Sequence, residues 1–235
     1  MKILLNNFDL NEALKKVKSL GYVPTMGSIH KGHEYLIKQS KRRSKKTLVS
    51  IFINPKQFNN KTDYKNYPKN INKDLKILKK LKTDFVYIPK SKDVFNKINQ
   101  KDIKLEKKDK ILCAKYRKGH FEGVLKVMDR LTNLIKPKKI FMGEKDYQQL
   151  YLVKKFIEKR YKSKIIACKT VRDRNNLALS SRNLLLTNKQ KLLAGKLTMK
   201  IMELKYFIKK HKNIRSLIKL KKNEFEKKFK IKIEY

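Results

Sequence analysis

One stretch near the amino end decides the fold class of this chain: Gly21-Tyr22-Val23-Pro24-Thr25-Met26-Gly27-Ser28-Ile29-His30-Lys31-Gly32-His33. Residues 21–25 are largely apolar, which predicts a strand that runs into a turn. An amphipathic helix is expected from about His33 to Arg43. Gly27 and Gly32 lie in the junction, where the lack of a side chain lets the backbone approach a ligand closely. The stretch therefore predicts a strand–turn–helix unit of an α/β protein.

Short apolar runs and longer segments of helical period alternate as far as residue 168. Strands are predicted at 47–53, 84–89, 139–143 and 164–168, and helices at 68–81, 121–135 and 147–159. A weaker strand is expected at 103–105, inside the lysine-rich segment 91–118. Alternation at this spacing predicts βαβ units and a parallel sheet, which binds its ligands at the carboxyl ends of the strands.

The pattern changes after Asn183, where the chain becomes helical. Helices are expected at 192–209 and 215–228, before a closing segment at 231–235. We therefore expect an α/β first domain over residues 1–169 and a small second domain over residues 170–235.

The most unusual property of the sequence is its charge. The 235 residues include 63 lysines and arginines against 20 aspartates and glutamates, so the formal net charge is +43. A charge of this size is typical of nucleic-acid-binding proteins. Lysine is nevertheless spread through almost every segment, and aromatic residues do not recur beside it as they do on base-stacking surfaces. We interpret the excess as compositional drift toward AT-rich codons, as in reduced bacterial genomes, and expect no specific nucleic-acid partner.

Membrane proteins and disulfide scaffolds are excluded by the sequence. Its apolar runs fall short of the roughly 20 residues that a membrane helix needs. The first ten residues include Asn6, Asn7 and Asp9, where a secretory signal would be continuously apolar. Cys113 and Cys168 form no CxxC motif and have no metal-ligand spacing with the histidines, so we expect neither a disulfide nor a metal site. These features predict a reduced, cytoplasmic protein without a membrane segment.

His30 and His33 are the strongest candidates for chemistry. They flank Gly32 near the start of the expected helix, where free backbone N–H groups and the helix dipole favour an anion. Imidazoles at that position can donate hydrogen bonds to phosphate oxygens as charge moves onto a leaving pyrophosphate. The alternative is a pair of surface histidines in a turn.

Further candidates follow other predicted strands. Asn54 and Gln57 follow the strand at 47–53 and can hold hydroxyl and carboxylate oxygens without adding charge. Lys145 follows the strand at 139–143 and can bind a phosphate. Its neighbour Asp146 can hold a ribose hydroxyl or a magnesium-bound water, or it can cap the next helix.

Two hydroxyls and a guanidinium stand together in the expected second domain. Ser180, Ser181 and Arg182 form a set suited to phosphate binding. Lysine has replaced arginine nearly everywhere else, so Arg172, Arg174 and Arg182 are candidates for bidentate contacts, unless they were retained by chance. Taken together, the residues predict an α/β enzyme that binds a nucleotide and transfers its adenylyl group by in-line attack on the α-phosphate.

The order and spacing of these blocks resemble the pantoate–β-alanine ligase family from about residue 22 to residue 193. The resemblance rests on residues 23–27 with 30–33, 50–58, 67–68, 119–121 with 123–124, 143–150 and 177–183. It implies a Rossmann-like parallel sheet flanked by helices, a small α+β C-terminal domain that is truncated here, and a homodimer. It also implies the substrates (R)-pantoate, β-alanine and ATP, with Mg²⁺ held mainly by ATP oxygens and water and without a named protein ligand.

The reaction that the resemblance implies has two halves. The pantoate carboxylate attacks the α-phosphate of ATP, which gives pantoyl adenylate and pyrophosphate. The amine of β-alanine then attacks the acyl adenylate and releases pantothenate and AMP. This agrees with the adenylyl transfer predicted from the residues alone, because an acyl phosphate anhydride supplies the leaving group that a bare carboxylate lacks.

The resemblance also implies roles for individual positions. Catalytic roles are implied for His30, His33, Lys145 and Arg182, with His33 as the proton donor. Gln57 and Gln149 would hold pantoate, and Gln57 would also meet β-alanine. The implied ATP-binding residues are Met26, Gly27, Ser28, Ile29, His30, Lys31, Gly32, His33, Gly143, Glu144, Lys145, Asp146, Val171, Leu179, Ser180, Ser181 and Arg182. Within this set, position 171 would touch the adenine side, and positions 179–182 would close over the phosphates.

The chain departs from the family's usual pattern at three places. Lys118 replaces the proline of an Arg-Pro-Gly-His-Phe block, and Asn176 replaces a glycine, which affects the expected turn geometry. The family normally continues past the segment matched by 231–235 into more strands of the small domain's sheet. We therefore expect an unpaired sheet edge and a more mobile lid, with every matched site residue lying before Asn183.

Three other hypotheses stay open. A nucleotidyltransferase with the same His-x-Gly-His motif could act on a different acceptor, although the block at 54–58 then has no evident use. The chain could also be a nucleic-acid-binding protein on a relic fold, which would bind duplex DNA with a steep salt dependence. A decayed enzyme is the third hypothesis, and the intact site blocks argue against it.

Overall fold

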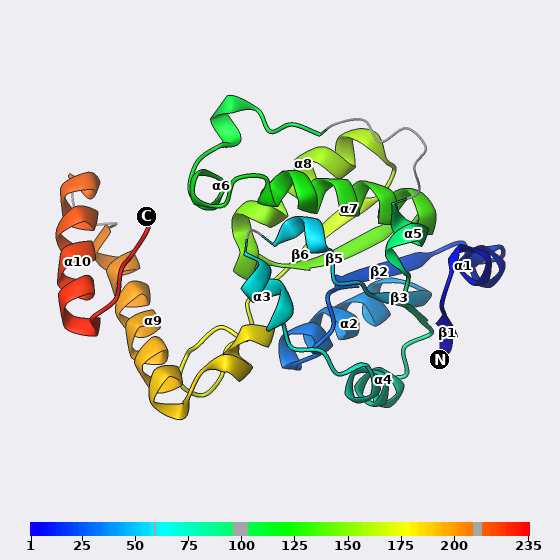
Figure 1. Cartoon of the computed structure of the whole chain (residues 1–235), viewed down its shortest axis with the longest axis horizontal. Coiled ribbons are helices and arrows are strands. Elements are labelled where there is room, and N and C mark those ends of the chain that lie inside the picture. The colour runs from blue at the N-terminus through cyan, green and yellow to red at the C-terminus, as the bar shows by residue number, and fades with distance from the viewer. Residues whose placement is uncertain (59, 96–102, 209–212) are drawn as a thin grey trace. The chain divides into compact units, whose positions relative to one another are not determined.

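The computed structural model describes residues 1–58, 60–95, 103–208 and 213–235 (Figure 1). The chain divides into two compact units, Met1–Thr170 and Val171–Tyr235. The first unit carries a six-stranded sheet, and the second is built mainly of helices. None of the helices in the described ranges combines the length and the apolar character needed to cross a membrane.

The sheet of the first unit is parallel throughout. Its strands are β1 (Lys2–Leu4), β2 (Leu20–Thr25), β3 (Lys46–Ile51), β4 (Phe85–Tyr87), β5 (Lys139–Gly143) and β6 (Lys164–Cys168). Their spatial order is β1-β4-β3-β2-β5-β6, and Thr25 at the end of β2 lies opposite Ile51 at the end of β3. From β2 the chain builds toward one edge through β3 and β4, and later toward the other edge through β5 and β6. The winding direction therefore changes between β2 and β5, where parallel α/β sheets bind ligands.

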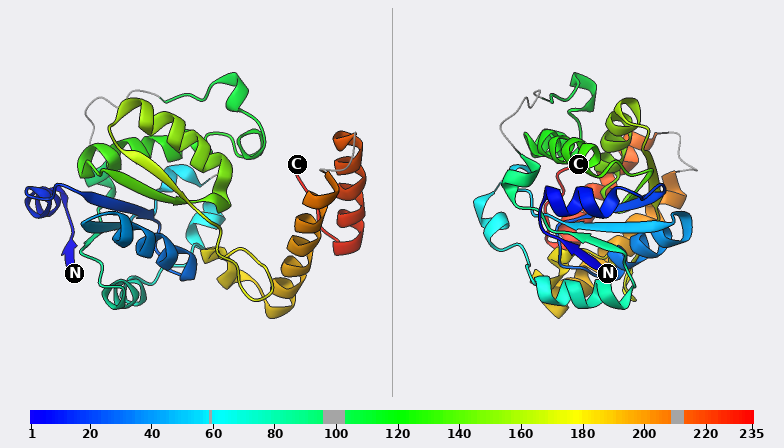
Figure 2. Two further views of the ribbon diagram at one scale, coloured as in Figure 1. Left: turned by 180° about the vertical axis from the view of Figure 1, so that it is seen from behind. Right: turned by 90° about the vertical axis from the view of Figure 1, so that its right-hand side faces the viewer.

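Helices cover both faces of this sheet, as Figures 1 and 2 show. The helices α2 (Lys31–Arg43) and α4 (Ile71–Lys80) lie on one face, and α1 (Asn7–Leu14), α7 (His120–Ile135) and α8 (Tyr147–Arg160) lie on the other. Shorter segments fill the connections: α3 (Lys61–Lys65), α5 (Ser91–Val94), α6 (Cys113–Tyr116), η1 (Pro55–Gln57), η2 (Lys107–Asp109) and η3 (Glu144–Asp146). The predicted parallel sheet flanked by helices is confirmed.

Side chains of the central strands alternate between two hydrophobic cores. The core under α7 and α8 takes Tyr22, Leu48, Tyr87 and Ile140. The core under α2 and α4 takes their chain neighbours Val23, Val49, Val86 and Phe141. All eight side chains are fully buried, and each stabilises the fold by about 1.5–3 kcal/mol relative to exposure. Burial on both faces explains why these strand sequences are almost continuously apolar.

The structure differs from the sequence prediction in several segments. The described residues 103–106 contain no strand; Ile103 and Leu105 instead pack against the core under α7 and α8. The strand β1 and the helix α1 were not predicted, because a strand of three residues is too short to show a period. The helix α2 begins at Lys31, two residues earlier than expected, with His30 as its N-cap.

The second unit contains η4 (Ser181–Leu185), α9 (Asn188–Ile208) and α10 (Ile214–Phe229). Among its described residues, an isolated antiparallel bridge between Arg172 and Ala178 is the only β pairing. Residues 231–235 therefore form no sheet edge, contrary to our expectation. Instead, the backbone N–H groups of Ile231 and Ile233 donate to the backbone oxygen and the carboxylate of Glu226.

Asn176 keeps the turn geometry that the loss of a glycine put in doubt. Its φ is +66°, in the left-handed region that asparagine tolerates better than other residues with a side chain. The Asp173 carboxylate accepts the backbone N–H groups of the two residues that flank Asn176, from Asn175 at 2.8 Å and from Leu177 at 3.0 Å. The turn before residues 177–183 is therefore built by an Asx-type network rather than by a glycine.

The ends of the helices reflect the composition of the chain. Asparagine side chains accept a backbone N–H at the N-caps of α1, α3, α4 and α10, which contributes about 1 kcal/mol per cap relative to alanine. Lysine, in turn, takes the left-handed position that follows α4, α7 and α10, at Lys82, Lys136 and Lys230. Glycine is the usual residue at such positions.

Candidate active site

The predicted ATP-binding residues of the first unit fall in two segments at one end of the sheet. Residues 26–33 follow β2, and residues 143–146 end β5 and form η3. Because β2 and β5 are paired neighbours, both segments lie where the winding direction of the sheet changes. The Thr25 hydroxyl strengthens this end, since it donates to the backbone oxygen of Ser50 at 2.7 Å and accepts the N–H of Gly27 at 3.2 Å.

The loop after β2 is held in its shape by a carboxylate from α4. Gly27 (φ +79°) and Ser28 (φ +52°) both adopt left-handed conformations. The Asp74 carboxylate accepts the N–H of Ser28 at 2.8 Å and the N–H of Ile29 at 2.7 Å. A Cβ at Gly27 would lie 2.9 Å from Asp74 Oδ2, so both the φ angle and the close contact require glycine there.

Asp74 is a residue that the sequence prediction missed. It is 3% exposed, and burial raises the pKa of its carboxyl, while the two backbone N–H groups and Lys73 act to lower it. In the sequence it is an aspartate in the first turn of a helix, where acidic residues are common. Its role depends on a contact across 46 residues, which no local pattern reveals.

The two histidine rings lie side by side, with centroids 4.0 Å apart. His30 Nδ1 accepts the N–H of Gly32 at 3.1 Å, so the proton of the neutral ring lies on Nε2, which is available as a donor. His33 Nδ1 is enclosed and has no hydrogen-bond partner among the described residues.

Both histidines are neutral at neutral pH. Burial lowers the pKa of His30 to about 4, and the nearby charge of Lys145 lowers it further. Burial also lowers the pKa of His33 to about 3, with added contributions from His30 and Lys145. The ammonium group of Lys145 therefore carries the positive charge of this site, and the two histidines are neutral hydrogen-bond donors.

Lys145 comes from the other segment of the site and lies near enough to both histidines for its charge to lower their pKa values. Its Nζ lies 3.0 Å from Asp146 Oδ1, in an ion pair between neighbouring residues of η3. Asp146 occupies the N-cap position of α8 but makes no side-chain capping hydrogen bond there. The structure thus brings His30, His33 and Lys145 together, with Asp146 as a counter-charge to the lysine.

The turn after β3 brings Gln57 to the same loop. The Gln57 side-chain amide donates to the sulfur of Met26, which begins the segment after β2. Asn54 instead holds the turn itself: it is 1% exposed, its Oδ1 accepts the N–H of Lys56, and its Nδ2 donates to the oxygen of Gly123. Of the two amides predicted to hold a ligand, Gln57 is therefore the one placed beside the site.

The predicted residue Gln149 lies in the first turn of α8, which begins at Tyr147, two residues after Lys145, and it is half-buried. Its neighbour Gln148 is used elsewhere, because its amide donates to the backbone oxygens of Asp109 and Ile111. Gln149 therefore stands at the carboxyl end of β5, in the part of the first unit that holds the histidines' partner Lys145.

The remaining predicted residues belong to the second unit. The N–H of Leu179 donates to the oxygen of Val171 at 3.0 Å, so these two positions are neighbours. Ser180 is the N-cap of η4 and accepts the N–H of Arg182 at 3.3 Å. Ser181 is buried, and the Arg172 guanidinium donates to the oxygen of Asn176. Contact of residues 171 and 179–182 with a nucleotide stays a prediction.

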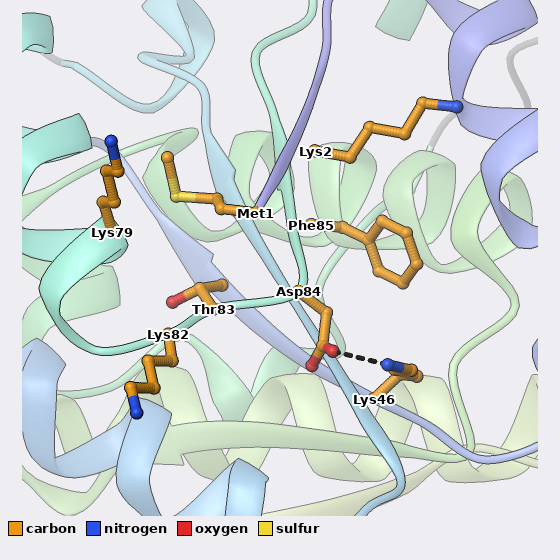
Figure 3. A pocket seen from close by; sticks show the side chains of 8 residues that line it. All are labelled: Met1, Lys2, Lys46, Lys79, Lys82, Thr83, Asp84 and Phe85. Atoms are coloured by element: carbon orange, nitrogen blue, oxygen red, sulfur yellow. Dashed lines mark hydrogen bonds and ion pairs between the residues drawn. The ribbon is translucent and has the colours of Figure 1, made fainter.

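A cavity lies at the other end of the sheet from the predicted site. It has a volume of about 590 Å³ and is lined by Met1, Lys2, Lys46, Lys79, Lys82, Thr83, Asp84 and Phe85. These residues surround the amino ends of β1, β3 and β4, away from the predicted site (Figure 3). Lys46 is paired with Asp84 at 2.9 Å, and the side chains of Lys79 and Lys82 point in different directions. The cavity therefore offers no convergent set of cations.

Comparisons with known proteins identify the family of this chain. The model of the family described as pantoate-beta-alanine ligase matches residues 3–235. A pantothenate synthetase of Azobacteroides pseudotrichonymphae is 39% identical over 233 residues, which cover 97% of this chain and 82% of that protein. A pantothenate synthetase of Francisella philomiragia is 42% identical over 189 residues, or 80% of this chain and 72% of that protein.

Solved structures show the same fold. The pantoate-beta-alanine ligase of Francisella tularensis, complexed with beta-gamma ATP and beta-alanine, superposes with a TM-score of 0.86 at 35% identity, covering 100% of this chain and 88% of that one. The enzyme of Thermus thermophilus superposes with a TM-score of 0.80 at 32% identity, covering 84% and 72% of the two chains. The family match spans almost the whole sequence, and sequence and structure agree on it. The chain belongs to the pantoate–β-alanine ligase family and is an enzyme that joins pantoate to β-alanine.

Proposed function

We propose that this ligase activates (R)-pantoate with ATP at the carboxyl ends of β2 and β5 and then transfers the acyl group to β-alanine. The observation that carries the proposal is the meeting of His30, His33 and Lys145 at this end of the sheet. The Francisella relative, crystallised with an ATP species and β-alanine, supports the choice of substrates.

The proposed reaction has two steps. A pantoate carboxylate oxygen bonds to the α-phosphorus of ATP as the bond to pyrophosphate breaks, which gives pantoyl adenylate. The β-alanine amine then bonds to the acyl carbon, AMP leaves with the electron pair of the broken C–O bond, and the amine gives up a proton. The acyl phosphate is the activated species that makes the amide bond possible.

The site residues would stabilise the charge that moves in the first step. The ring N–H groups of His30 and His33 donate to phosphate oxygens as neutral partners, and the Lys145 ammonium offsets the negative charge. The N-terminus of α2, with the loop shaped by Asp74, adds backbone N–H groups and the helix dipole. Preorganised donors of this kind lower the barrier without reorganising during the reaction.

Gln57 and Gln149 would hold the acid substrate. An amide can donate to a carboxylate and accept from a hydroxyl, so it suits a hydroxy acid without adding charge. Gln57 would also meet β-alanine once pantoyl adenylate has formed. From the second unit, Val171 would contact the adenine side, and Leu179, Ser180, Ser181 and Arg182 would close over the phosphates.

Magnesium would reach the site on its nucleotide. Among the described residues, no group of three or more His, Cys, Asp or Glu side chains could hold a metal ion. As the family resemblance implies, we propose that Mg²⁺ is held through ATP oxygens and water, where it neutralises phosphate charge. We also propose that the enzyme is a homodimer, as the family resemblance implies, and that it is cytoplasmic, as its cysteine usage indicates.

The exchange of labelled pyrophosphate into ATP by the purified protein, with magnesium, tests the adenylation step. We expect exchange that requires pantoate and not β-alanine. Exchange without pantoate would contradict the assigned acceptor, and absence of exchange from folded protein would contradict adenylation. Two matched variants, Lys145→Gln and Lys159→Gln, each remove one lysine, the first in the site and the second exposed at the end of α8. Only Lys145→Gln is expected to lose exchange activity.

A further inference from the structure

The start of α7 is packed against the turn that carries Gln57. The His120 Nδ1–H donates to the backbone oxygen of Gln57 at 2.6 Å. Gly123, one turn later, lets α7 come so close that a Cβ there would collide with the backbone oxygen of Lys56. The Asn54 amide closes the contact by donating to the oxygen of Gly123 at 3.1 Å. Helix and turn are thus joined at three points.

We propose that His120 is a positioning residue that sets the Gln57 side chain for pantoate and β-alanine. This inference rests on the proposed function of Gln57. His120 acts through Gln57, because its hydrogen bond fixes the backbone carbonyl of Gln57. The side chain of the same residue extends to Met26. A chain of contacts therefore runs from α7 through the turn after β3 to the loop after β2.

The surroundings of His120 suit this role. It is the first residue of α7, it is 8% exposed, and it follows Gly119, whose φ of +77° turns the chain into the helix. A residue at this position is rigid, because its backbone belongs to a helix that is buried along one face. A donor fixed on a rigid element holds its acceptor more precisely than a loop residue can.

The far side of Gln57 is anchored independently. The ring of Phe58, the next residue, packs edge-on against Tyr64 at 5.3 Å and against Tyr67 at 5.6 Å between centroids. Tyr67 is buried and leads toward α4, which carries Asp74. With Phe58 anchored in this way, loss of the His120 hydrogen bond should displace the Gln57 carbonyl without unravelling the whole segment. The expected effect is therefore on substrate affinity rather than on folding.

The test compares two substitutions by pantoate-dependent pyrophosphate exchange. His120→Leu removes the donor, and His120→Asn retains an amide N–H close to the position of Nδ1. We expect His120→Leu to raise the KM for pantoate about tenfold, the usual scale for a lost buried hydrogen bond, with the KM for ATP nearly unchanged. His120→Asn should restore most of the affinity. A purely structural role would instead lower the active fraction, and so kcat, without moving the KM for pantoate alone.

A double-mutant cycle with Gln57→Ala decides whether His120 acts through Gln57. We expect His120→Leu to have little further effect on the KM for pantoate when Gln57 is already alanine. Additive effects, equal changes in both KM values, or an Asn variant no better than the Leu variant would each overturn the inference. Failure of the wild-type protein to show pantoate-dependent exchange would instead contradict the proposed function, so the two failures are distinguishable.

Discussion

The Asp74 carboxylate and the backbone N–H of Ser28 lie 2.8 Å apart although 46 residues separate them in the sequence. This bond and its companion to Ile29 hold two consecutive left-handed residues in the loop that precedes both histidines. The shape of the proposed nucleotide loop is therefore set by α4, an element that contributes no residue to the predicted site.

Replacing Asp74 should impair ATP binding and stability together. Asp74→Ala leaves two backbone N–H groups without their acceptor, so we expect the free energy of unfolding to fall by about 2–4 kcal/mol. The KM for ATP should rise more than the KM for pantoate. Asp74→Asn, which keeps one acceptor oxygen, should lie between wild type and Asp74→Ala. Denaturant unfolding and exchange kinetics check this, and an unchanged KM for ATP in a folded Asp74→Asn variant would contradict it.

The low pKa values of the histidines predict loss of stability in acid. In the unfolded chain a histidine takes up its proton near pH 6.5, whereas folded His33 does so only near pH 3. The stabilisation is therefore complete above about pH 6.5 and is lost as the pH falls toward 3, because the unfolded state binds more protons in that range. Enclosed His33 contributes a slope of up to about 1.4 kcal/mol per pH unit.

The variant His33→Gln isolates this contribution. It removes the titrating group and keeps a neutral side chain, so the free energy of unfolding should change less between pH 7 and pH 5 than it does in the wild type. Urea unfolding at the two pH values measures the difference. Equal pH dependence of the variant and the wild type would show that His33 titrates normally in the folded protein.

Lys145→Gln should change both catalysis and histidine titration. Removing the cation should lower the rate of pantoate-dependent exchange by roughly 100-fold, the scale for loss of one charge-stabilising donor. It should also raise the pKa of His30, because the charge of Lys145 contributes to lowering it. NMR titration of the His30 ring measures this shift. The control variant Lys159→Gln replaces an exposed lysine on α8. It should leave the exchange rate and the pKa of His30 at their wild-type values.

Gly123→Ala should destabilise the folded protein although the backbone at Gly123 is helical and would itself accept alanine. The new Cβ would collide with the Lys56 oxygen, and since the obstacle is backbone, helix and turn must separate. We expect a loss of about 1–3 kcal/mol in the free energy of unfolding. Glu122→Ala, the neighbouring residue on α7, serves as the control in thermal unfolding. An unchanged melting temperature for Gly123→Ala would show that α7 and the turn are not in close contact.

Much of the first unit follows from local patterns. The strands at 139–143 and 164–168 were predicted with the bounds that the structure has, because they are apolar, short and bordered by polar residues. The position of residues 26–33 and of Lys145 at the carboxyl ends of the strands was expected for a parallel sheet. Their meeting depends on the pairing of β2 with β5, which only the structure gives.

The missing parts depend on contacts that are distant in the sequence. Asp74 and His120 both act on backbone atoms of remote loops, and their local sequence gives each another plausible role, in a helix first turn or in a family block. Ile103 and Leu105 alternate like a strand, yet tertiary packing uses them as irregular cover for the core. For Asn54, its position after a strand and its amide group suggested ligand binding, whereas burial assigns its amide to the turn.

The left-handed lysines after α4, α7 and α10 have a consequence for how this protein can change. Each non-glycine residue in that conformation costs roughly 1 kcal/mol relative to glycine, and Lys82, Lys136 and Lys230 all carry this cost. Together, these three costs amount to a sizeable share of the roughly 5–15 kcal/mol by which a folded domain is typically more stable than its unfolded chain. A chain with lysine in place of glycine at these positions therefore keeps a narrower margin of stability, and fewer further substitutions can accumulate before the fold is lost.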